Sequence, residues 1–111
     1  DKNLILFSSG SLQYVHPSFF SIFFFKIKNY RNLNLFIEEP VFLPFIDKSN
    51  LISKMRGDTS FSHKYDVYAR KVNCKIIENQ TIRAYPKDNP ITAYHTDHRK
   101  NTGTFFLHIK I

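Results

Sequence analysis

The sequence has no tryptophan, one cysteine, three glycines and no long apolar run. The single cysteine, Cys74, excludes an intramolecular disulfide framework, which small secreted domains often need. Three glycines are too few for a glycine-rich linker or a phosphate-cradling loop. The most apolar stretch, residues 19–25, is much shorter than the roughly 20 residues of a membrane-spanning helix. These absences favour an intracellular chain without a transmembrane segment.

What is present is enough apolar material for one core. The chain has 111 residues, of which 42% are hydrophobic, and both values are typical of a single globular domain. Phenylalanine, with 12 copies, is the most abundant aromatic residue. We therefore expect residues 1–111 to form one domain with a core rich in phenylalanine.

The positive charge is concentrated in the second half of the chain. Residues 1–53 hold five basic and four acidic residues, a balance of +1, whereas residues 54–111 hold eleven and five, a balance of +6. A Phe-rich, nearly neutral half is thus followed by a basic half, which indicates an anionic partner, with nucleic acid before a membrane surface. Abundant Asn, Lys, Ile, Phe and Tyr are also typical of AT-rich coding, which would by itself raise the lysine content and suggests an organellar origin, such as the mitochondrion.

Turn-forming residues recur about every ten positions, a spacing typical of β proteins. Several segments between the turns alternate apolar and polar residues, as half-buried strands do. We therefore predict a mainly β fold, a small barrel or sandwich of antiparallel strands. The predicted strands are residues 3–7 and 12–16 as an opening hairpin, then 19–28, 33–37, 41–46, 71–76, 81–85 and 105–111.

Three segments are less regular than these strands. Pro44 places residues 41–46 at a sheet edge or in an irregular segment, because proline cannot donate to a central ladder. Residues 47–56 form a candidate short helix, with Asp47 or Ser49 as its cap and Gly57 after its end. Residues 65–72 have a partial helical stripe, but we interpret them as the start of a long strand.

Basic and aromatic side chains alternate along the second half and suggest RNA binding. Lysine and arginine neutralise phosphates, and exposed aromatic rings can stack on unpaired bases. Known base-reading motifs are absent from the sequence, so we expect contacts to the phosphate backbone, as in a ribosomal protein or another ribonucleoprotein component. The candidate phosphate contacts are Lys64, Arg70, Lys71, Lys75, Arg83, Arg99, Lys100 and Lys110. The candidate stacking rings are Tyr68, Tyr85 and Tyr94.

The Phe-rich half supports a second hypothesis, an accessory subunit or interaction module that docks on a larger complex, such as a membrane-associated one. Residues 19–25 contain more aromatic surface than one strand usually buries. The candidate interface residues are Phe19, Phe20, Phe23, Phe24 and Phe25.

Catalysis is not indicated by the sequence. His95, Asp97 and His98 are residue types that bind Zn²⁺ or Fe²⁺, but the neighbouring Arg99 and Lys100 disfavour a cation. Cys74 is expected to point inward, where a thiol is inert. We therefore predict a non-enzymatic protein with no metal and no cofactor. The Asn79 tripeptide matches the glycosylation pattern, which is short enough to occur by chance.

Overall fold

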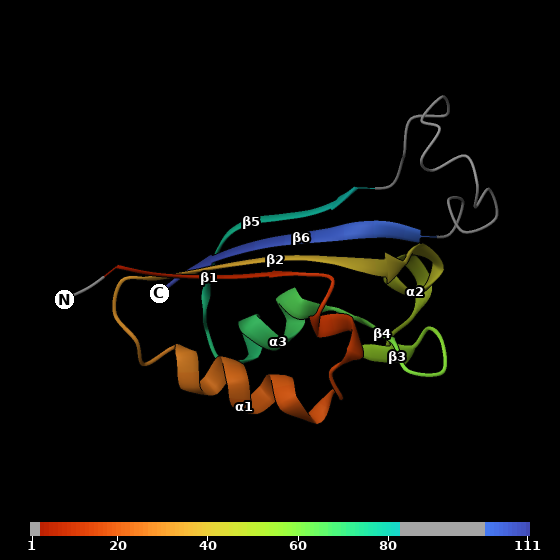
Figure 1. Cartoon of the computed structure of the whole chain (residues 1–111), viewed down its shortest axis with the longest axis horizontal. Helices are drawn as coiled ribbons and strands as arrows, with labels where there is room; N and C mark the ends of the chain where they lie inside the picture. Colours follow the sequence, from red (N-terminus) through yellow and green to blue (C-terminus); the bar gives the residue numbers. More distant parts are fainter. Residues whose placement is uncertain (1–2, 83–101) are drawn as a thin grey trace.

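The computed structural model describes residues 3–82 and 102–111, and its main feature is a mixed four-stranded sheet (Figure 1). The strand order is β1-β2-β6-β5, and a second, two-stranded sheet pairs β3 with β4. The prediction of a strand-rich chain is confirmed. The predicted antiparallel barrel or sandwich is wrong, because the sheet stays open and its β1–β2 pair is parallel.

The four long strands are β1 (Leu4–Ser9), β2 (Leu33–Phe42), β5 (Lys75–Ile82) and β6 (Thr102–Lys110). Strand β2 pairs in parallel with β1 on one side and antiparallel with β6 on the other, and β6 pairs antiparallel with β5. Strands β1 and β5 are therefore the sheet edges. The remaining elements lie below the sheet or beside its end in Figure 1.

The predicted opening hairpin of residues 3–7 and 12–16 is wrong. Gly10 adopts a left-handed backbone conformation with φ of 81°, and the chain then forms a short 3-10 helix, η1 (Leu12–Tyr14). The chain leaves the sheet at this point, and β1 finds its partner in β2 instead. Two adjacent parallel strands need a crossover connection, which η1 and the following helix provide.

That helix is α1 (Ser18–Ile27), where the sequence predicted a strand over residues 19–28. Its buried residues are Phe20, Phe24 and Ile27, spaced as one helical face. Apolar residues surround the whole helix, so the 3.6-residue period was hidden in the sequence. The need for a crossover between parallel strands, which only the tertiary structure reveals, decides in favour of a helix.

Helix α3 (Tyr65–Lys71) is a second correction, because residues 65–72 were interpreted as a strand. Tyr65, Tyr68 and Ala69 form its buried stripe. Asn73 ends the helix in a left-handed conformation with φ of 62°, a role for which asparagine is suited. The alternation predicted for residues 71–76 therefore begins only at Lys75, where β5 starts.

The middle of the chain also differs from the prediction. Strand β2 continues to Phe42, and helix α2 (Leu43–Lys48) follows at once, with Pro44 in its first turn, where the missing N–H is harmless. The helix predicted at residues 47–56 is wrong, because the chain leaves α2 and forms the hairpin of β3 (Ser53–Met55) and β4 (Phe61–His63).

The core lies between the sheet and helices α1 and α3. The predicted alternation of residues 105–111 is confirmed, since Phe105, Leu107 and Ile109 are all at most 3% exposed. On β2 the matching inward positions are Leu33, Leu35, Ile37, Glu39 and Val41.

Gly103, in β6, occupies a position that has no room for a side chain. A Cβ atom there would lie 2.6 Å from the carbonyl oxygen of Ile82 and 2.6 Å from Leu43 Cδ2. We expect Gly103→Ala to destabilise the fold by about 1–3 kcal/mol, because the backbone of β5 would have to move. Urea unfolding measures this change. Gly57→Ala is the control, since its Cβ meets only the Ser60 hydroxyl at 3.2 Å, and an equal loss in both variants would contradict the packing argument.

Candidate nucleic-acid interface

The outward face of the sheet, which we call the open face, is not covered by any of the described helices (Figure 1). The strand register gives its residues, because alternate side chains of each strand point to one side. Phe36 on β2 is paired with His108 on β6, and Phe7 on β1 is paired with Phe36. The Phe36 and His108 rings stack with centroids 4.2 Å apart. The open face therefore presents aromatic groups on its two central strands.

Lysines gather at one end of this face. Lys75 and Lys110 are exposed and are direct cross-strand partners of β5 and β6. Neither lysine has an ion-pair partner among the described residues. Like charges placed directly opposite each other are destabilising. An anion bound between them would relieve this repulsion. The face also carries two carboxylates, Glu38 and Glu78, so its positive charge is confined to the lysine end.

The structure places the other predicted phosphate contacts differently. Lys71 is exposed at the end of α3, but Arg70 forms a 3.0 Å ion pair with Asp66 one helical turn earlier. Lys64 donates to the Ser49 carbonyl and lies over the Phe45 ring, 5.0 Å from its centroid. Only part of the predicted set is therefore brought together. Arg83, Arg99 and Lys100 lie outside the described residues.

The predicted stacking rings are not those that the open face presents. Tyr68 is 7% exposed and its hydroxyl lies 2.6 Å from Ser53 Oγ, so its ring belongs to the core. Tyr85 and Tyr94 lie outside the described residues. The Phe36–His108 stack was missed because its two members are 72 positions apart in sequence. Alternation in residues 105–111 did place His108 on the polar face, but only the register reveals its partner.

The Phe-rich segment divides between core and surface. Phe20 and Phe24 are fully buried, whereas Phe25 is 56% exposed. Phe19 and Phe23 stack on each other at the edge of the core, with centroids 5.2 Å apart. Helix α1 therefore has an outward apolar surface as well as a buried one. No described helix is both long enough and apolar enough to cross a membrane.

The groups considered for catalysis form no site in the described part of the chain. His95, Asp97 and His98 lie outside it, and no three His, Cys, Asp or Glu side chains within residues 3–82 and 102–111 could hold a metal ion. Cys74 is half-buried beside the core, where burial raises the pKa of its thiol despite the nearby Lys28. A raised pKa disfavours the reactive thiolate.

A buried polar cluster, which sequence reasoning missed, lies behind the sheet. Glu39 is completely buried, and its carboxylate accepts hydrogen bonds from Ser8 Oγ at 2.9 Å and from the Gln13 backbone N–H at 3.0 Å. The Gln13 side chain donates to the Gly10 carbonyl and accepts from Arg56. The cluster therefore ties β1, η1 and the β3–β4 hairpin to the central strand. The alternation along β2 could have predicted this burial, because it places Glu39 on the same face as Ile37 and Val41.

Two further groups of this interior are also ionisable. His63 Nδ1 lies 2.7 Å from Ser53 Oγ, while His63 Nε2 forms no hydrogen bond with a described residue. Burial lowers the pKa of His63 to about 4, although nearby backbone carbonyls of Val15 and Leu12 partly oppose this. Burial and the Glu39 charge raise the pKa of Tyr65, whose hydroxyl has no described partner.

A serine beside an imidazole can form a nucleophilic pair in an enzyme. Here His63 is fully buried and Ser53 also bonds Tyr68, so the Ser53–His63 contact belongs to a structural network.

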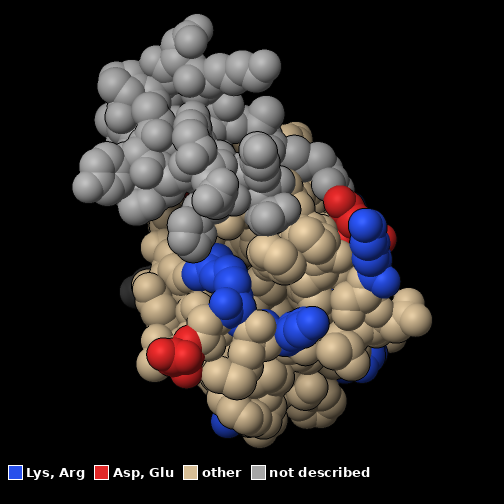
Figure 2. All heavy atoms as spheres, turned by 90° about the vertical axis from the view of Figure 1, so that its right-hand side faces the viewer, with Lys and Arg blue, Asp and Glu red and all other residues tan. Residues whose placement is uncertain are grey.

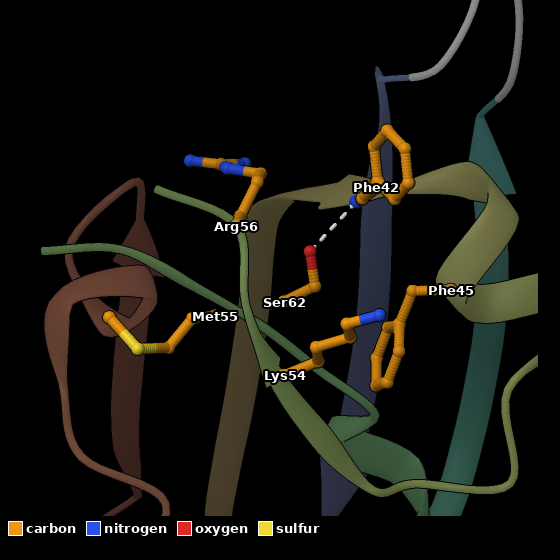
Figure 3. Close-up of a pocket in the computed structure, with 6 residues that line it drawn as sticks. All are labelled: Phe42, Phe45, Lys54, Met55, Arg56 and Ser62. Carbon is orange, nitrogen blue, oxygen red and sulfur yellow. Dashed lines mark hydrogen bonds between the residues drawn. The ribbon is translucent and has the colours of Figure 1, made fainter. Parts of the chain in front are cut away.

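A pocket of about 120 Å³ opens at the end of the sheet beside α2 and the hairpin (Figure 3). We call it the end pocket, and it is lined by Phe42, Phe45, Lys54, Met55, Arg56 and Ser62. Lys54 is the cross-strand partner of Ser62, so both lie on the same face of the hairpin. Figure 2 looks onto this end of the molecule, where several Lys and Arg side chains lie near a hollow in the surface.

Comparison with known proteins gives no relative. No protein-family model, no curated protein and no solved structure matches the chain.

The lowered pKa of His63 predicts a pH dependence of stability. The unfolded histidine has a pKa near 6.5 and the folded one about 4, so only the unfolded state gains a proton between these values. We expect the free energy of unfolding to be unaffected by this group above pH 6.5 and to fall by about 3 kcal/mol on its account as the pH reaches 4.

Urea unfolding at several pH values measures this loss. His63→Gln is expected to remove this loss of free energy of unfolding between pH 6.5 and 4, whatever its effect on stability at neutral pH. Equal slopes for wild type and His63→Gln would contradict the assignment.

Proposed function

We propose that this chain is a non-enzymatic, basic structural protein that binds RNA through the phosphate backbone, as a component of a ribonucleoprotein such as an organellar ribosome. The observation that carries the proposal is the cross-strand pair of exposed lysines, Lys75 and Lys110, at one end of the open face. A phosphate between two lysines removes their mutual repulsion and releases counterions from the RNA.

The aromatic groups next to these lysines support the same proposal. Lys110, His108 and Phe106 are alternate residues of β6 and lie in this order on the open face, starting from its lysine end. The ring of His108 stacks on that of Phe36. Unpaired bases stack on exposed aromatic side chains of open sheets in many RNA-binding domains. The lysine end and the aromatic centre of the face together suit a short single strand.

The double variant Lys75→Gln/Lys110→Gln tests this proposal. Each phosphate neutralised on a single strand contributes about 0.7 to the slope of log affinity against log salt, so losing the one phosphate bound between the two lysines is expected to reduce the slope by about 0.7 and to weaken binding at low salt. Filter binding of a single-stranded oligoribonucleotide over a series of salt concentrations measures it.

The matched control is Lys26→Gln/Lys48→Gln, which removes the same charge from exposed positions in α1 and α2. Its salt slope is expected to stay at the wild-type value. Equal losses in the two double variants would show that only total charge matters, and no retention of RNA by the wild type at low salt would remove the proposal.

An accessory subunit that docks on a partner protein is the second candidate, and the outward surface of α1 favours it. Ile22 is 60% exposed and Phe25 56% exposed, one helical turn apart. Because both side chains are already partly buried, covering the rest at an interface would contribute about 1–2 kcal/mol for each.

A photo-crosslinking amino acid at Phe25 tests the second candidate in the native host cell. We expect one discrete protein adduct from position 25 and none from Asp58, which is exposed in the β3–β4 loop. Absence of any adduct from position 25, with the chain folded and expressed, would remove this candidate.

A further inference from the structure

The end pocket is positively charged and contains no acid. Two of its six lining residues, Lys54 and Arg56, are cationic, and none is acidic. A third cation, Lys64, lies over the ring of the lining residue Phe45. Concave surfaces lined by one sign of charge concentrate ions of the opposite sign. The pocket is therefore suited to an anion.

Arg56 is held in place before any ligand arrives. Its guanidinium donates to Gln13 Oε1, and Gln13 is itself fixed through its backbone N–H by the buried Glu39 carboxylate. A guanidinium has five N–H donors, so one bond to Gln13 leaves others for a ligand. Positioning by the buried cluster reduces the side-chain entropy that binding would otherwise remove.

Ser62 supplies a buried hydroxyl. It is 1% exposed, and its oxygen accepts a 2.8 Å hydrogen bond from the Phe42 N–H, the dashed line in Figure 3. A serine hydroxyl that accepts still has a proton to donate. No described residue accepts that proton. A phosphate oxygen in the pocket would satisfy this donor.

The remaining walls are apolar and aromatic. Phe42 is 37% exposed beside the pocket, and Phe45 and Met55 complete this wall. A volume of about 120 Å³ holds about eight to twelve water-sized groups, since one such group needs about 10–15 Å³. That is more than the five heavy atoms of a phosphate, so the pocket also has room for part of an attached sugar or base beside the rings.

We propose that the end pocket binds a phosphate monoester carried on a nucleoside, with Lys54, Arg56 and Ser62 holding the phosphate and Phe42 contacting the attached group. Two sources have this chemistry, a free mononucleotide and the phosphorylated end of an RNA strand. The end pocket lacks both open-face lysines, so this site does not depend on the proposed RNA surface.

Titration of the ¹⁵N-labelled full chain with adenosine 5′-monophosphate, inorganic phosphate and adenosine, each at near-physiological salt, tests the site. We expect saturable shifts of the Phe42 and Ser62 amides with the monophosphate, weaker shifts with phosphate and none with adenosine. Lys54→Gln is expected to raise the dissociation constant about tenfold, the lower range for a hydrogen bond to a charged group, and Lys54→Arg to restore most of the affinity.

The matched control is Lys26→Gln, an exposed lysine on α1, which is expected to bind as the wild type does. Lys54 is also exposed, so its substitution leaves the fold intact, and the amide spectrum verifies this. Equal dissociation constants for wild type and Lys54→Gln, or no saturable shift at Phe42 and Ser62, would overturn the proposal.

Oligoribonucleotides with a 5′-phosphate or a 5′-hydroxyl distinguish the two sources. An affinity gain from the phosphate that Lys54→Gln abolishes identifies an RNA end, and binding of the mononucleotide alone identifies a free nucleotide. The open-face variant Lys75→Gln/Lys110→Gln is expected to keep mononucleotide affinity. The two proposals therefore fail separately. The open face can fail to bind RNA while the end pocket binds the mononucleotide, and the end pocket can fail while the open face binds RNA.

Discussion

The burial of the Glu39 carboxylate in the middle of β2 is the constraint on which the rest of the structure depends. A carboxylate with no exposure must be met by hydrogen-bond donors, because an unpaired charge in the interior is very unfavourable. The donors come from Ser8, just before β1 ends, and from Gln13, in η1. The turn at Gly10 brings both to the same carboxylate, so the change of direction after β1 and the position of the central strand are set together.

The same group connects the interior with the candidate sites. Through Gln13 it positions Arg56 at the end pocket, and its charge acts on Tyr65 in the core. Replacing one partner of such a network leaves the others buried and unsatisfied, so the effects of single substitutions on stability are expected to be non-additive. The pocket is thus shaped by an ionisable group that it does not contain.

The sequence predicted those parts of the fold that depend on local alternation. The last strand was predicted with its inward and outward residues correctly assigned, and residues 33–37 lie within β2. The sequence-based prediction failed where tertiary contacts decide between helix and strand. The apolar run in α1 has no visible period, and Asn73 ends α3 by a conformation that propensity alone does not reveal. The alternation that was read across residues 71–76 joined the end of a helix to the start of a strand.

The candidate sites were predictable to a smaller degree, because they combine residues that are distant in sequence. Lys75 and Lys110 were both named from composition, but only the β5–β6 register makes them neighbours. The end pocket joins Phe42 to Ser62 and Lys54 through the hairpin, and none of the three was singled out by any motif. The number of charges could be counted from the sequence, whereas the concave surface on which they could bind an anion could not be predicted from it.

Strand β1 has a consequence for how the chain behaves at high concentration. It is an edge of the sheet, and Leu4, Ile5, Leu6 and Phe7 are each at least 40% exposed. An apolar edge with free backbone N–H and C=O groups is a template on which another strand can be added, and this edge lacks the lysine or proline that commonly protects such strands. Handling of the isolated chain therefore calls for low protein concentration, because intermolecular β-pairing competes with the monomer.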